Sequence, residues 1–235
     1  MSEEFRGLGT SSSPIDREAL TRQAVAASIQ RIKVATKDLS VGMHSAWILP
    51  TRRQQVGTTC FFSGPVQMAE DSGRHISEQR LAEAATAQGL LNSRGAVTGD
   101  PEKRALMEKF VYEQTGVRIR HDQPKMPEGT LQAIDLRLLK CVTQDGNLAL
   151  LLYPLPQFNQ NDWNGRGEWV ALYGVEKTPE DALFHMTFSG SGDKGIVETL
   201  NTSQMAQRLY GVSGGRAEIW SMMVQTPYPE NPTSA

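Results

Sequence analysis

Hydrophobic side chains recur every three to four residues through the first two thirds of the chain, which is the spacing of amphipathic helices. Val25, Ile29 and Ile32 have this spacing and predict a first helix over residues 14–37, with Ser13 as its N-cap. Three further helices are expected, each with a recognisable start or stop signal. They are about residues 78–91 after Ser77, 101–115 between Asp100-Pro101 and Gly116, and 130–142.

The last third of the chain changes to short, continuous apolar runs. Such runs are typical of strands that are buried on both faces. Because helices come first and strands that can pair antiparallel follow, the pattern predicts an α+β fold. The expected strands are residues 148–153, 169–175, 182–188 and 219–224, and a short extended run is expected at 45–49.

Composition and charge exclude several classes of protein. The chain has 235 residues, enough for one domain with a real core, and its net charge of −2 gives no electrostatic argument for nucleic acid as a partner. No apolar run approaches the roughly 20 residues of a membrane span, so membrane insertion is not expected. The first residues lack the pattern of a signal peptide. We therefore expect a cytoplasmic protein, or one exported without a cleaved signal.

The two cysteines, Cys60 and Cys141, form no C-x-x-C motif and have no histidine cluster beside them, so neither a structural zinc nor another cofactor is expected. Cys60 precedes an apolar stretch that predicts a helix. A thiol at a helix N-terminus meets the positive end of the helix dipole, which favours the nucleophilic thiolate. Gln54, six residues upstream, could donate its amide to an oxyanion. The alternative is that Cys60 packs as a small buried hydrophobic residue.

Three segments resemble papain-like cysteine peptidases. Q-Q-V-G-T-T-C-F-F-S-G-P-V-Q-M-A-E, at 54–70, is similar to their nucleophile segment, in which a glutamine six residues before the cysteine helps to form the oxyanion hole. G-E-W-V-A-L-Y-G-V-E-K, at 167–177, is similar to the strand that starts with the catalytic histidine and reaches a glycine six residues later. Glu168 and Gly174 keep that spacing. I-S-E-Q-R-L-A-E-A, at 76–84, resembles the helix that follows the nucleophile helix.

The resemblance covers about residues 45–224, and the order of elements is most similar to a compact bacterial branch, the double-glycine leader peptidases and the staphopain-like effector peptidases. It implies a papain-like α+β fold, with a helical half packed on an antiparallel sheet. The expected organisation has four parts. They are a disordered N-terminus at 1–12, a helical extension at 13–40, the papain-like domain at 41–225 and a flexible tail at 226–235.

The chain departs from the family at the base. Glu168 stands where the family has its histidine, and a carboxylate with a pKa near 4.3 is a weak base toward a thiol near 8.5. Alternatively, Glu168 is a strand-edge carboxylate or pairs with Arg166 or Arg53. Pro65 is expected to kink the nucleophile helix or to delay its start, which would leave Cys60 on a turn.

One further family position is also altered. For the family's third residue, an Asn or Asp, the chain offers Ser189 or Gly190, with Asp193 slightly late. His185, in the strand after Glu168, is the histidine best placed to act as an alternative base. The other histidines are expected to be structural or exposed; they are His44, His75 and His121.

Two classes of function remain open from the sequence. The first is a cysteine peptidase or amide hydrolase or transferase with Cys60 as nucleophile, Gln54 as oxyanion donor and either Glu168 or His185 as an atypical base. The second is an inactive pseudopeptidase that binds a peptide or protein segment in the former active-site cleft. Retention of Cys60 and Gln54 favours the first class, whereas loss of the histidine favours the second. The expected partner is a peptide or protein in both cases, and the sequence does not indicate an oligomeric state.

Overall fold

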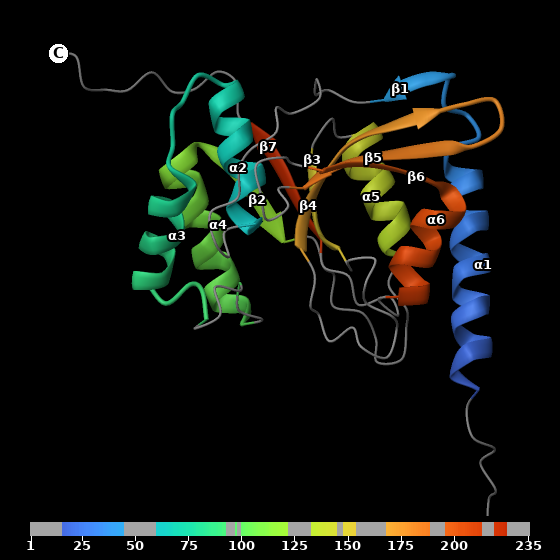
Figure 1. Ribbon diagram of the computed structural model, residues 1–235, viewed down its shortest axis with the longest axis horizontal. Helices are drawn as coiled ribbons and strands as arrows, with labels where there is room; N and C mark the ends of the chain where they lie inside the picture. The colour runs from blue at the N-terminus through green and yellow to red at the C-terminus, as the bar shows by residue number, and fades with distance from the viewer. Residues whose placement is uncertain are drawn as a thin grey trace, which may run out of the picture.

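The computed structural model contains a seven-stranded antiparallel sheet with helices on both of its faces (Figure 1). Among the described residues, no helix is long and apolar enough to cross a membrane. The structure describes residues 16–44, 60–92, 97, 100–121, 133–144, 148–153, 168–188, 196–212 and 219–224. For 148, 150–153, 168, 188, 196 and 219–224 it gives no side-chain description.

The described helices are seven segments, the last of them a π-helical turn. They are α1 (Arg17–Ala35), α2 (Cys60–Asp71), α3 (Glu78–Ala87), α4 (Pro101–Thr115), α5 (Ile134–Thr143), α6 (Thr202–Ala206) and η1 (Gln207–Val212). The sheet has the order β2-β7-β3-β4-β5-β6, and β1 pairs with the far end of β4. The strands are β1 (Gly42–His44), β2 (Val117–His121), β3 (Leu148–Tyr153), β4 (Glu168–Lys177), β5 (Ala182–Phe188), β6 (Ile196–Asn201) and β7 (Ile219–Val224).

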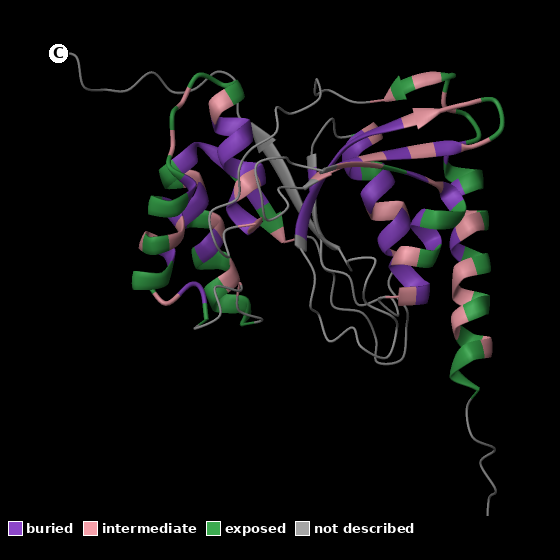
Figure 2. Ribbon diagram, viewed as in Figure 1, coloured by how far each residue is buried: buried purple, intermediate pink, exposed green. Residues whose placement is uncertain are grey.

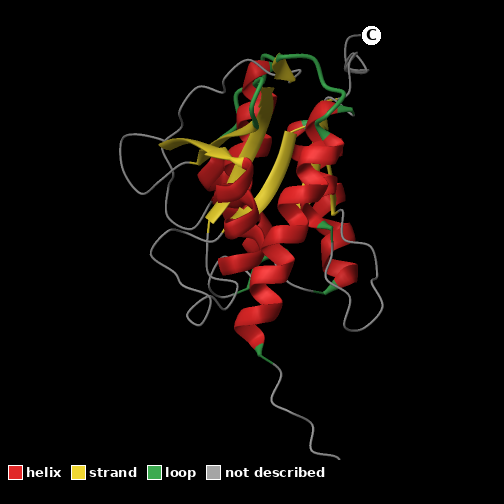
Figure 3. Cartoon of the chain, turned by 90° about the vertical axis from the view of Figure 1, so that its right-hand side faces the viewer, coloured by secondary structure: helices red, strands yellow, loops and turns green. Residues whose placement is uncertain are grey.

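Strand β4 lies between two hydrophobic cores because successive side chains of a strand point to opposite faces. Val170 and Leu172 join the core formed with α1, α5, α6 and η1. Trp169 and Tyr173 join the second core, formed with α2, α3 and α4. Figure 3, viewed from the side of α1, shows this helix in front of the strands. The α+β class predicted from the sequence is therefore confirmed.

The first helix is part of the folded unit. Ile32 of α1 is fully buried in the core that α1 shares with α5 and β4. The predicted N-cap is wrong: α1 begins at Arg17, and its N-cap is Asp16, whose side chain accepts a hydrogen bond from the Ala19 N–H. Asp is as good a cap as Ser, and the spacing of hydrophobic residues cannot choose between two caps a few residues apart.

The next two helices begin at the predicted N-caps, and α4 also ends at its predicted glycine, whereas α3 ends at Ala87, before the predicted end at about residue 91. Ser77 caps α3 and Asp100 caps α4, and Gly116 ends α4 with a left-handed φ of 70°. Phe110 and Val111 of α4 are buried, whereas Leu106, also apolar, is 54% exposed. Met107 is fully buried and forms the buried face of α4 together with Phe110 and Val111, at helical spacing.

The structure also contains elements that the pattern did not predict. Strand β2 follows α4 in the helical part of the chain, yet it pairs with β7 at one edge of the sheet. Its sequence, V-R-I-R-H, alternates apolar and basic residues, and Val117 and Ile119 are buried. This alternation with a period of two is the signal in the sequence that could have predicted the strand. Strand β6 with α6 and η1 was missed too, and the run expected at 45–49 lies outside the described residues.

Candidate functional site

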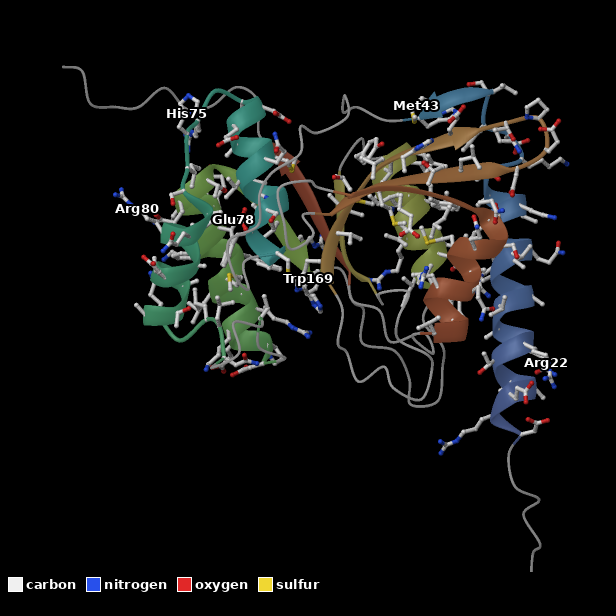
Figure 4. The ribbon with its side chains drawn as sticks, in the orientation of Figure 1. Arg22, Met43, His75, Glu78, Arg80 and Trp169 are labelled. Atoms are coloured by element: carbon white, nitrogen blue, oxygen red, sulfur yellow. The ribbon has the colours of Figure 1, made fainter. Side chains whose placement is uncertain are left out.

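The first turn of α2 is packed against the start of β4. The Phe61 ring meets the Trp169 ring edge to face, with 5.3 Å between their centroids, and Phe61 meets Phe62 in the same way at 5.4 Å. Trp169 is labelled in Figure 4, where it lies at the lower end of β4. Both phenylalanines are buried, as is most of α2 (Figure 2). These aromatic contacts fix the position of the residue that precedes them, Cys60.

Cys60 is the first residue of α2 and is partly exposed. The backbone N–H groups of a helix's first turn have no partner within the helix, and they carry the positive end of its dipole. The prediction that Pro65 would delay the helix is wrong, because α2 runs from Cys60 through Pro65 to Asp71. Proline removes the one hydrogen bond that its N–H would have made, and the buried packing of α2 offsets this loss.

The structure places the backbones of Cys60 and Glu168 at the same end of the α2–β4 pair. Glu168 is the first residue of β4, and its neighbour Trp169 contacts Phe61. The Glu168 side chain lies outside the described part of the chain, as does Gln54. Residues 189, 190 and 193, considered for the third family position, lie outside it too.

His185 lies far from this end of β4. It is paired in register with Gly174, six residues beyond Glu168, which corresponds to about 20 Å along a strand. Its Nε2 is 3.0 Å from an oxygen of Glu176, and its Nδ1 is 3.1 Å from the Thr199 hydroxyl. The imidazole is therefore engaged at the opposite end of the strand and is not brought to Cys60. Met43 of β1, which pairs with Glu176, marks that end in Figure 4.

The remaining histidines have separate positions. His75 is exposed in the segment before α3 (Figure 4), and the His44 ring bonds to a backbone oxygen. His121 is the last residue of β2 and is partly buried beside α4, where its Nδ1 is 3.5 Å from Arg104 and its backbone N–H donates to Glu108. His75 is exposed and His44 and His121 make local contacts, which agrees with the expectation that these histidines are structural or exposed.

A polar contact that the sequence did not reveal anchors the other side of α2. Ser63, one turn after Cys60, donates a hydrogen bond of 3.2 Å to the carboxylate of Glu78. Glu78 is the first residue of α3 and is buried (Figure 4), where the positive end of the α3 dipole favours its charge. Gln67, a further turn along α2, donates to Asp71. The start of α2 is thus held by aromatic rings on the sheet side and by a carboxylate on the α3 side.

Cys141 differs from Cys60 in its surroundings. It is a buried residue of α5 and belongs to the same core as Leu138, Val142 and Ala149. It therefore packs as a small hydrophobic residue. Within the described ranges, no group of three or more His, Cys, Asp or Glu side chains is arranged to hold a metal ion.

Comparisons with known proteins gave no match. No family model matches the sequence, and neither the curated proteins nor the solved structures contain a significant similarity.

Proposed function

We propose that this chain is a papain-like domain that binds a peptide or protein segment where α2 meets the start of β4, and that it has lost most or all of the family's peptidase activity. One observation carries the proposal: α2 begins at Cys60, and its first turn packs through Phe61 on Trp169, the second residue of β4. In papain-like peptidases these two starts carry the nucleophile and the base, and the substrate lies between them.

The chemistry of the site supports binding more than cleavage. A thiol peptidase needs a base that takes the thiol proton near neutral pH and then pairs as a cation with the thiolate. Glu168 occupies that position, and a carboxylate there disfavours the thiolate by charge repulsion. On the α3 side of the helix start, the Glu78 carboxylate accepts a hydrogen bond from Ser63, one turn after Cys60. His185 is bonded to Glu176 and Thr199 at the far end of β4.

A second candidate function is an amide hydrolase or transferase in which Cys60 attacks and Glu168 serves as the base. Its support is that Cys60 is partly exposed at a helix N-terminus, whereas a purely structural cysteine such as Cys141 is buried. A carboxylate can act as a base near neutral pH when burial raises its pKa. The two candidates differ in whether Glu168 helps or opposes the thiol.

Peptide binding can be tested by photo-crosslinking from Cys60. A cysteine-linked photo-crosslinker would be attached to Cys60 in a Cys141→Ala variant and exposed to a random decapeptide pool. The control is an Arg22→Cys variant that also carries Cys60→Ala and Cys141→Ala, so the same crosslinker is attached at an exposed position of α1. We expect several-fold more crosslinked peptide from position 60. Equal yields from the two positions would contradict the binding proposal.

The loss of peptidase activity can be tested with Glu168→His. If the site lacks only its base, this substitution should create cleavage of a fluorogenic protein substrate that depends on Cys60, while the parent shows little or none. The matched control is Glu168→Gln, which removes the negative charge without supplying an imidazole. Strong Cys60-dependent cleavage by the parent, lost in Glu168→Gln, would favour the second candidate and overturn the first.

A further inference from the structure

Three side chains on neighbouring strands form a continuous hydrogen-bonded chain away from Cys60. Glu176 is on β4, His185 on β5 and Thr199 on β6, and His185 and Thr199 are directly paired in register. The imidazole joins the other two groups, with 3.0 Å from Nε2 to the Glu176 carboxylate and 3.1 Å from Nδ1 to the Thr199 hydroxyl. The array is therefore carboxylate, imidazole and hydroxyl, in the order that activates a hydroxyl nucleophile.

The carboxylate determines which nitrogen of the neutral imidazole carries the proton. An ionised Glu176 can only accept, so Nε2 must be the donor toward it, and Nδ1 then presents its lone pair to Thr199. In this tautomer the Thr199 hydroxyl donates to Nδ1. The hydroxyl proton thus already points at the atom that would remove it.

The surroundings of the array leave its hydroxyl accessible. Thr199 is exposed, while the His185 side chain is only 14% exposed and the Glu176 side chain 39%. The partner of His185 on its other side is Gly174, which has no side chain to crowd the imidazole. A β-bulge at this point of β4 turns the Tyr173 ring toward His185, with 6.0 Å between ring centroids.

Strand β6 also offers hydrogen-bond donors beside Thr199. Among the described strands, β6 pairs only with β5 and lies at the end of the sheet. Every second backbone N–H of such an edge strand points away from its partner. These groups are suited to receive the carbonyl oxygen of an approaching acyl group.

We propose that Thr199 is a base-activated nucleophile that accepts an acyl group from an activated donor such as an aryl ester or a thioester. The Thr199 oxygen forms a bond to the acyl carbon, and its proton moves to Nδ1 of His185. Glu176 stabilises the imidazolium through Nε2. The bond from the acyl carbon to the leaving oxygen or sulfur breaks, the leaving group departs with that electron pair, and the proton passes from His185 to the leaving group or to water. The product is an acyl-threonine ester.

This activity does not depend on the proposed function at Cys60, since His185 lies about 20 Å along β4 from the start of the strand. The test therefore uses a variant with Cys60→Ala and Cys141→Ala, in which no thiol can be acylated. The protein is incubated with p-nitrophenyl acetate, release of p-nitrophenolate is followed, and the acetylated residue is located by peptide mass mapping.

We expect one acetyl group per chain at Thr199, lost in Thr199→Val and retained in Thr199→Ser, which keeps the hydroxyl. His185→Gln and Glu176→Gln should slow acetylation at least about tenfold, because general-base assistance contributes on the order of a hundredfold or more. Thr187→Val is the matched control, since Thr187 lies on β5 two residues from His185 and outside the array. Its acetylation rate should be unchanged. Acetylation confined to lysines, or a Thr199 rate equal in His185→Gln and the parent, would overturn the proposal.

Discussion

At the residue scale, Asp135 is a fully buried carboxylate whose side-chain partners lie on other elements. It lies at the start of α5 and accepts hydrogen bonds from the Arg31 guanidinium, the Tyr210 hydroxyl and the Leu136 N–H. Arg31 on α1 also makes an ion pair of 2.9 Å with it and lies over the Tyr210 ring. A buried carboxylate is tolerated only when it is compensated in this way. The charge therefore ties α1 and η1 to α5.

Arg31→Ala should destabilise the protein by about 3 kcal/mol, because removing one partner of a buried ion pair leaves the other charge uncompensated. Arg22→Ala, on the same helix, removes an exposed ion pair with Glu18 and should cost less than about 0.5 kcal/mol. Urea unfolding of the two variants gives the comparison. Similar losses of unfolding free energy in both variants would mean that Arg31 does not compensate the buried charge of Asp135.

At the scale of elements, α3 and α4 illustrate what local sequence signals can and cannot establish. Local signals predicted the N-caps Ser77 and Asp100 and the stop at Gly116. Ser and Asp side chains can accept from the first N–H groups of a helix, and glycine adopts the left-handed conformation that ends one. The phase of α4 was not predictable in this way, since Leu106 and Met107 are adjacent and both apolar. Only the packing of α4 on α2 and β2 decides which of them is buried.

The phase of α4 makes a direct prediction for two adjacent residues. Met107→Ala should lower the free energy of unfolding by about 2–5 kcal/mol, because it leaves a cavity in the core beside Phe110 and Val111. Leu106→Ala should change it by no more than about 0.5 kcal/mol, since that side chain is 54% exposed. Thermal or urea unfolding measures both. A larger effect at Leu106 would mean that the described phase of α4 is wrong.

At the scale of the whole molecule, contacts between distant segments were beyond the reach of the sequence. Arg31 and Asp135 are 104 residues apart, and β2 joins β7 across about a hundred residues. No local pattern specifies such pairings. The α+β class, most helices and four strands could be predicted, because each depends on nearby residues. At the candidate site, the sequence left Cys60 either at a helix start or, because of Pro65, on a turn, and the structure has it at the start of α2. The bonds of His185 and the contact between Ser63 and Glu78 were not predicted.

The Tyr210 hydroxyl makes global stability sensitive to alkaline pH. Burial, and then the neighbouring Asp135 charge, raise its pKa from 10.0 to about 12. Between these values the unfolded chain loses the proton that the folded protein keeps, so stability present below pH 10 is lost as pH rises toward 12, by about 3 kcal/mol in total. Tyr210→Phe should reduce the slope of unfolding free energy against pH in this window. An unchanged slope would mean that the Tyr210 hydroxyl does not cause the loss of stability at alkaline pH.

We propose that Cys60 has the position of a nucleophile and that Glu168 stands in place of the family's base. The most direct measurement is the rate of Cys60 alkylation by iodoacetamide between pH 5 and 10, in Cys141→Ala and in the same variant with Glu168→His. We predict slow alkylation below pH 7 in the parent, rising only near the range of an ordinary thiol, about 8.5, and faster alkylation at low pH once the histidine is present. Rapid alkylation of the parent below pH 7 would contradict the account.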